Sequence, residues 1–134
     1  MARYIAFDWG KSRTGIAITD SSAIIASPHS TISTGELNST VKKLHDEEPC
    51  AGFVVGVPGL IVGLQTDSTA GIDQFINHLE STYSSTPVYR VDESHTSSEA
   101  LDTLISGGMK KSKRREKGCL DKVSAALILQ RFLQ

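Results

Sequence analysis

The fold of this chain is decided near its start by residues 4–18, YIAFDWGKSRTGIAI. Two apolar runs, 4–7 and 16–18, flank a polar turn that contains glycine, and this pattern predicts two antiparallel strands with a short connection. Asp8 ends the first run, directly before the turn. The end of a strand in an α/β sheet holds a side chain rigidly at the solvent edge, so Asp8 is a candidate site residue.

The period of the apolar residues then switches repeatedly between that of a strand and that of a helix, which is typical of an α/β fold. Strands are predicted at 3–8, 14–19, about 23–32, 52–57 and 87–91. Helices are predicted from Ser33 to Pro49, over 72–83, from Thr96 to Gly107 and from about 119 to 132, the first with the Ser33 and Glu36 spacing of a capping box. The order βββαβαβαα predicts a ribonuclease H-like fold, with a mixed five-stranded sheet, a central first strand and helices on both faces.

Composition sets the general class of the protein. A chain of 134 residues with 39% hydrophobic residues and a net charge of -1 predicts one soluble globular domain over 1–134. Cys50 and Cys119 lack the spacing of a disulfide framework or a metal site. No signal peptide and no apolar run of membrane-spanning length is recognised, so we expect a cytoplasmic protein without a membrane partner.

Two further acidic sites lie far from Asp8 in the sequence. Asp92 and Glu93 follow the last predicted strand, and Asp121 lies in the first turn of the last predicted helix. Each carboxylate has a plain structural alternative, because an aspartate before a glycine turn often bonds the local backbone and acidic residues at a helix start are favoured by its dipole. The residues alone leave open whether the three sites converge.

Four segments carry a family resemblance: Asp8–Ala17, Val55–Pro58, Val91–Glu93 and Lys117–Gln130. In this order and spacing they are similar to the YqgF/RuvX family, described as Holliday junction resolvases and as nucleases that mature precursor 16S ribosomal RNA. The resemblance implies a nuclease that acts on structured nucleic acid. It favours maturation of the 5′ end of precursor 16S rRNA, and branched DNA is the alternative substrate.

The resemblance also implies that the carboxylates bind metal. Hard oxygen ligands suit Mg²⁺, or Mn²⁺, which activates water and neutralises a scissile phosphate. Asp8 is predicted as the bridging ligand, with Glu93 and Asp121 as the other two. Because side chains alternate along a strand, only one of the adjacent pair is expected to face Asp8, and Asp92 is given a supporting role. Ser94 stands where many members have arginine, which keeps open a non-catalytic RNA-binding or ribosome-assembly role.

A basic segment precedes the last predicted helix. Its six cations are Lys110, Lys111, Lys113, Arg114, Arg115 and Lys117. A run of charge is most often a solvated loop, but its place next to Asp121 favours binding to the phosphate backbone. Lys11 and Arg13 are expected to add phosphate contacts from the turn after Asp8, and a surface role is equally open for Lys11.

Three other features have competing interpretations. The turn after Asp8 also resembles the phosphate-binding opening of actin-like ATPases, but those proteins need two related domains. Trp9 is the one aromatic residue near the predicted site, which gives little support for single-strand stacking, and its simplest role is to pack the turn. The apolar loop Gly59–Leu64 predicts a partner or dimer contact, and we expect a monomer or weak homodimer.

Overall fold

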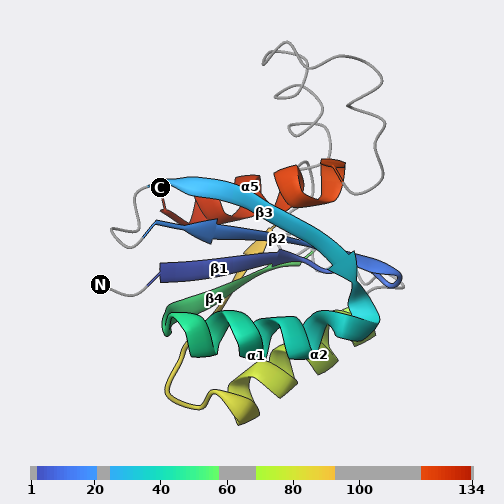
Figure 1. Cartoon of the computed structure of the whole chain (residues 1–134). Coiled ribbons are helices and arrows are strands. Elements are labelled where there is room, and N and C mark those ends of the chain that lie inside the picture. Colours follow the sequence, from blue (N-terminus) through green and yellow to red (C-terminus); the bar gives the residue numbers. More distant parts are fainter. Residues whose placement is uncertain (1–2, 21–24, 58–68, 93–118, 134) are drawn as a thin grey trace.

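The computed structural model describes residues 3–20, 25–57, 69–92 and 119–133, and at 69, 92 and 119–121 it describes the backbone alone. Its centre is a five-stranded sheet with the order β3-β2-β1-β4-β5 (Figure 1). The first three strands are antiparallel neighbours, whereas β1, β4 and β5 run parallel. The strands are β1 (Arg3–Asp8), β2 (Arg13–Thr19), β3 (Ala26–Ser33), β4 (Cys50–Val57) and β5 (Val88–Asp92).

The helices lie on both faces of this sheet (Figure 1). They are α1 (Leu37–Glu47), which a 3-10 turn η1 (Thr34–Glu36) precedes, α2 (Thr69–Thr82) and α5 (Cys119–Leu133). The predicted fold class is confirmed, including the central position of the first strand. The helix predicted from Thr96 to Gly107 lies outside the described residues. In the described part of the chain, no helix has both the length and the hydropathy needed to cross a bilayer.

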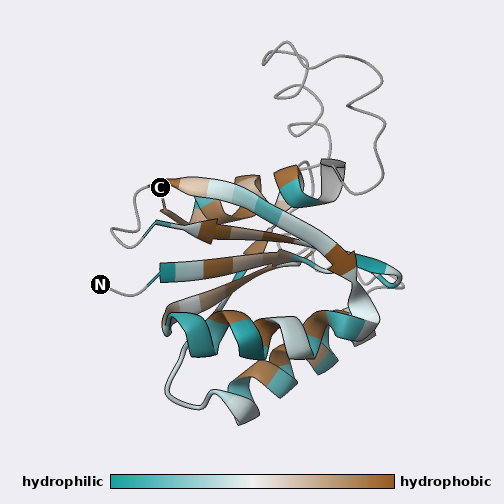
Figure 2. Cartoon of the chain, in the orientation of Figure 1, coloured by the Kyte–Doolittle hydropathy of each residue, from teal (hydrophilic) through white to brown (hydrophobic). Residues whose placement is uncertain are grey.

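The two faces of the sheet have different cores. On β1, Ile5 and Phe7 pack in the larger cluster with α1 and α2, whereas Ala6 between them packs against α5. Small residues dominate the α5 side, because Ala6 and Ala17 of the sheet meet Ala125 of the helix. Small side chains let a helix lie close to a sheet. Figure 2 shows mostly hydrophobic residues along the central strands and a paler, more hydrophilic β3 at the edge.

The predicted capping box at the start of α1 does not form. Ser33 precedes the first turn as expected, but neither Ser33 nor Glu36 makes a side-chain capping hydrogen bond. The neighbouring Thr34 bonds instead, donating from Oγ1 to the carbonyl oxygen of Gly10 and lying 2.9 Å from Oγ1 of Thr14. A tertiary contact with the turn after β1 therefore replaces the local motif.

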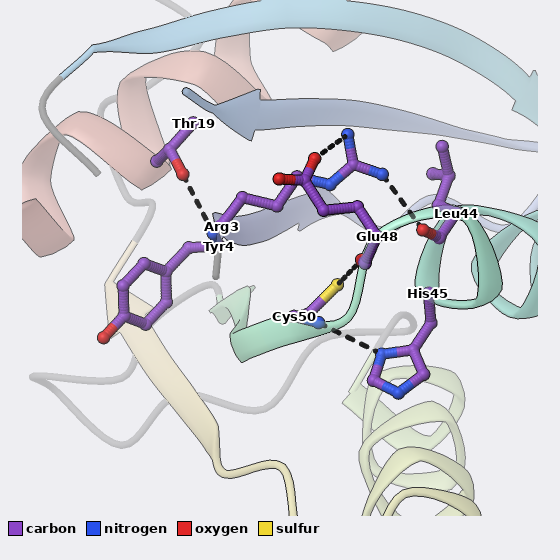
Figure 3. A network of polar contacts seen from close by, with 7 residues as sticks. All are labelled: Arg3, Tyr4, Thr19, Leu44, His45, Glu48 and Cys50. Atoms are coloured by element: carbon purple, nitrogen blue, oxygen red, sulfur yellow. Dashed lines mark hydrogen bonds and ion pairs between the residues drawn. The ribbon is translucent and has the colours of Figure 1, made fainter. Parts of the chain in front are cut away.

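A polar network joins the end of α1 to the amino ends of β1 and β4 (Figure 3). Arg3 donates to the carbonyl oxygen of Leu44 at 3.0 Å and lies 3.5 Å from the carboxylate of Glu48. The backbone N–H of Cys50 donates to Nδ1 of His45 at 3.3 Å. This network lies where β1 and β4 begin, at the opposite end of the sheet from Asp8. We therefore assign it a role in the stability of the fold.

Candidate active site

Asp8 ends the central strand between two glycines. Across the antiparallel pair it stands opposite Gly15. On the parallel side Phe7 pairs with Val55, so the next position beside Asp8 is Gly56. Both glycines are buried, and Asp8 itself is half-buried. Neither lateral neighbour has a side chain, so only backbone flanks the carboxylate on its two sides.

Asp8 belongs to the face of the sheet that α5 covers. Ala6, Ala17 and Val54 all pack in the cluster with α5. Side chains on a strand alternate between the two faces, so Asp8, two residues after Ala6, lies on this face. The same period puts Gly15 and Gly56 on it. The carboxylate and the two neighbouring glycines thus share one face and one end of the sheet.

The backbone of β5 brings Asp92 to the same edge. Val57 of β4 pairs with Asp92 in parallel register. Adjacent strands lie about 4.8 Å apart, so the ends of β1 and β5, with β4 between them, are separated by roughly 10 Å. Glu93 follows directly in the sequence and lies outside the described residues.

The first turn of α5 points to this edge as well. At the far end of the helix, the ring of Phe132 packs at a tilt against Tyr4, with 5.1 Å between ring centroids, and against Tyr89, with 4.7 Å. Both tyrosines lie near the amino ends of their strands. The helix therefore runs antiparallel to β1, as Figure 1 also shows. Its opposite end, with the backbone of Asp121, lies toward the carboxyl edge where β1 ends.

The structure describes the four predicted acidic residues to different extents. The backbones of Asp8, Asp92 and Asp121 lie toward one end of the sheet, while Asp8 is the only one of the four carboxylates with a described side chain. Among the described residues, no three His, Cys, Asp or Glu side chains gather around a common point. The assignment of metal ligands remains a prediction.

Two of the residues that are predicted to contact phosphate belong to the described part of the chain. Lys11 and Arg13 are exposed, in the turn after Asp8 and at the first residue of β2. The basic segment from Lys110 to Lys117 falls outside the described residues. Lys11 and Arg13 therefore place positive charge at the surface, in the turn and strand that follow Asp8.

Ser124 is a buried polar residue that the sequence pattern does not single out. It lies on α5 one turn after Asp121 and is 1% exposed. Its hydroxyl has no hydrogen-bond partner within the described residues. A buried unpaired hydroxyl costs about 1 to 3 kcal/mol, so a polar group at this position in a core of alanines is unusual. Its small size is consistent with the close approach of α5.

Comparisons with known proteins agree with this architecture. The family pattern named RuvX and described as "Holliday junction resolvase" matches residues 2–134. A protein of Parabacteroides distasonis named "Putative pre-16S rRNA nuclease" is 38% identical over 134 residues, which is 100% of this chain and 96% of that protein. A protein of Christiangramia forsetii with the same name is 38% identical over 133 residues, covering 99% of this chain and 98% of that protein.

Solved structures show the same fold at low identity. RuvC of T. thermophilus in complex with a Holliday junction substrate has a TM-score of 0.58 at 14% identity, covering 96% of this chain and 92% of that one. The fowlpox virus Holliday junction resolvase has a TM-score of 0.59 at 14% identity, covering 98% and 97%. With the family match over nearly all residues and relatives at 38% identity, the chain belongs to the RuvX family.

Proposed function

We propose that this protein is a divalent-metal-dependent nuclease that hydrolyses phosphodiester bonds in the precursor of 16S ribosomal RNA. The observation that carries the proposal is the position of Asp8, half-buried at the end of the central strand with Gly15 and Gly56 beside it. A carboxylate in such a setting can bind a divalent cation, and the cation in turn can hold a phosphate group close to it. The names of the relatives supply the substrate class.

The metal ligands in this proposal are Asp8, Glu93 and Asp121. Glu93 is preferred to Asp92 as the ligand, because side chains alternate along a strand and only one of the adjacent pair is expected to face Asp8. Asp92 is assigned a supporting role. The hard oxygen donor of Asp8 fits Mg²⁺ or Mn²⁺, and when bound the ion supplies an activated water and positive charge at the scissile phosphate.

The cations of the chain would hold the substrate. Lys11 and Arg13 are exposed beside Asp8 and can pair with phosphates on either side of the cut. The basic segment with Lys110, Lys111, Lys113, Arg114, Arg115 and Lys117 would extend this contact along the backbone. Such contacts carry no base code, so they suit recognition of a structured strand. We place this activity in the cytoplasm, with the protein as a monomer or weak homodimer.

Cleavage of a labelled substrate panel tests the proposal. The panel contains precursor 16S rRNA ends, a four-way DNA junction and plain single strands, each with Mg²⁺ or with EDTA. Wild type should cut the rRNA precursor only with metal, and Asp8→Asn should not cut. Asp46→Asn is the matched control, because Asp46 is exposed on α1 and, among the described residues, forms its ion pair with Lys42 on the same helix.

The other outcomes decide between the alternatives. Junction cleavage without rRNA cleavage would support a Holliday junction resolvase, which the family description favours. A resolvase must act on two strands, so it would also require a dimer at working concentration. Substrates that are bound but left intact by wild type and Asp8→Asn alike would instead identify a non-catalytic assembly factor.

A further inference from the structure

A cavity of about 200 Å³ opens between the start of α1 and α2, on the face of the sheet opposite α5. Trp9, Leu37 and Phe75 form its apolar part. Asn38, Gln74 and His78 supply polar groups. Figure 1 shows the two helices side by side below the sheet. The sequence predicts a packing role for Trp9, and the structure adds that its indole lines this cavity.

The cavity has a hydrophobic floor and a polar rim. Leu37 and Phe75 are 2% and 5% exposed, whereas Asn38 and Gln74 are exposed. Within the described residues neither side-chain amide has a hydrogen-bond partner. An amide offers both a donor and an acceptor, which is the pattern on the edge of a nucleobase. An apolar slot with free amides at its edge suits a flat heteroaromatic ring.

The indole of Trp9 is held in place by a close approach to α2. A Cβ at position 71 would overlap Cη2 of Trp9, so Gly71 makes room for the ring. The same ring packs against the larger core cluster. Because the wall of the cavity is fixed before any ligand arrives, binding does not require the indole to be ordered.

The location relates the cavity to the candidate site. Trp9 follows Asp8 directly in the sequence, so their Cα atoms are about 3.8 Å apart. The two residues lie at the same sheet edge, Asp8 on the α5 face and Trp9 in the cluster on the opposite face. A strand with a phosphate at Asp8 can therefore turn an adjacent base over this edge toward α1 and α2.

The cavity volume of about 200 Å³ suits a single base. Pockets for drug-sized ligands usually measure about 300 to 1,000 Å³, and this cavity is smaller. Proteins that read RNA commonly stack unpaired bases on aromatic side chains and bond their edges. We propose that the cavity beside Trp9 is a subsite for one unpaired base of the RNA strand that is cut at Asp8. The inference rests on the proposed function, because it names a subsite for the same substrate.

The single tryptophan of the chain makes a direct test possible. Asp8→Asn serves as the background, so that binding is measured without cleavage. Short single-stranded oligoribonucleotides, and the same strands with one abasic position, are titrated while the intrinsic fluorescence is followed. A base stacked in the cavity should change the Trp9 emission, and the abasic position that removes that base should abolish the change.

A double variant tests the two side-chain amides at the rim of the cavity. Asn38→Ala combined with Gln74→Ala should weaken binding of the intact strand by about fivefold or more, the value expected for one good bidentate amide contact. The same pair should leave binding of the abasic strand unchanged. Asn77→Ala is the matched control, because Asn77 is exposed on α2 outside the cavity.

The results separate this inference from the proposed function. Unchanged Trp9 emission, or equal affinity in the double variant and the Asn77→Ala control, overturns the subsite even if wild type cuts the rRNA precursor. A base-dependent change of emission whose titration midpoint shifts by about fivefold or more in the double variant supports the subsite. It does so even if no substrate is cut, in which case the nuclease proposal alone fails.

Discussion

Oγ1 of Thr34 donates a hydrogen bond to the carbonyl oxygen of Gly10, and so joins the start of the first helical segment to the turn that follows Asp8. The backbone N–H of Thr34 donates to the carbonyl oxygen of Ser12 at 3.1 Å, which adds a second bond to the same turn. Thr14, which is fully buried, lies 2.9 Å away from the Thr34 hydroxyl. The conformation of the turn beside Asp8 therefore depends on a residue far along the chain.

Replacing Thr34 by valine tests this connection. The shape of the side chain is kept, but the carbonyl of Gly10 and the buried hydroxyl of Thr14 lose their partner. We expect the free energy of unfolding to fall by about 1 to 3 kcal/mol, as measured by urea denaturation. Thr40→Val is the control, because the Thr40 hydroxyl donates to the nearby carbonyl oxygen of Glu36 in an exposed hydrogen bond. Equal losses in the two variants would contradict the assignment.

Gly10 allows the turn itself to close. A Cβ at this position would overlap the carbonyl oxygen of Arg13. Gly10→Ala should therefore move the backbone next to Asp8, lower the stability by about 1 to 3 kcal/mol and reduce any metal-dependent cleavage. Gly35→Ala offers a matched comparison, because a Cβ there meets only Oγ of Ser33 at 3.9 Å. A Gly10→Ala protein as stable and active as Gly35→Ala would refute the prediction.

Much of the architecture could be predicted because the apolar period is strong in the central strands. The end of β1 at Asp8 and the strand after Cys50 follow from short apolar runs bounded by turn residues. The two faces were also readable in principle, since small Ala6 lies between large Ile5 and Phe7. A close helix covers the small residue, and the larger core covers the other two.

Features that depend on distant residues could not be predicted in this way. The capping box at Ser33 failed because a local motif contributes about 1 kcal/mol, and the turn after β1 offered Thr34 another partner. The cavity beside Trp9 needs Gly71 and Phe75 of α2, about sixty residues later in the chain. The placement of Asp8 and Asp92 at the same end of the sheet depends in the same way on the register of β1, β4 and β5.

Metal binding should stabilise the folded protein through Asp8. A ligand that binds only the native state raises the free energy of unfolding by about 2.7 kcal/mol at a concentration one hundred times its Kd. Mg²⁺ or Mn²⁺ should therefore raise the Tm of wild type in a thermal melt, and EDTA should reverse the increase. Asp8→Asn should lose the increase, while Asp46→Asn should keep it. A metal-dependent Tm in Asp8→Asn would remove Asp8 from the ligand set.

The basic segment is expected to govern the salt dependence of RNA binding. Each phosphate contact with a single strand contributes a slope of about -0.7 to log K against log salt. Replacing Lys113, Arg114 and Arg115 by alanine should make that slope less steep by up to about 2. Binding is measured by titration at several salt concentrations. Lys42→Ala with Lys43→Ala, on the exposed side of α1, should leave the slope as it is in wild type.

Ionisation of the buried Cys50 thiol is expected to lower the stability of the fold at high pH. Burial raises the pKa of its thiol from 9.0 to about 11, although nearby Arg3 opposes the shift. Below pH 9 the thiol is neutral in both the folded and the unfolded chain. Between pH 9 and 11 the unfolded chain loses the proton first, so the free energy of unfolding falls as the pH rises. One pKa unit corresponds to about 1.4 kcal/mol, so the loss should reach about 2 to 3 kcal/mol.

Urea denaturation of wild type and Cys50→Ala between pH 8 and pH 11 measures this effect. Other groups titrate in the same range, among them Tyr83, whose pKa is also raised by burial. They are common to both proteins, so the difference between the two stability curves isolates Cys50. The curves should converge as the pH rises, because only wild type loses the contribution of the neutral thiol. Curves that stay parallel across the range would mean that the thiol ionises at the same pH in the folded and unfolded chains.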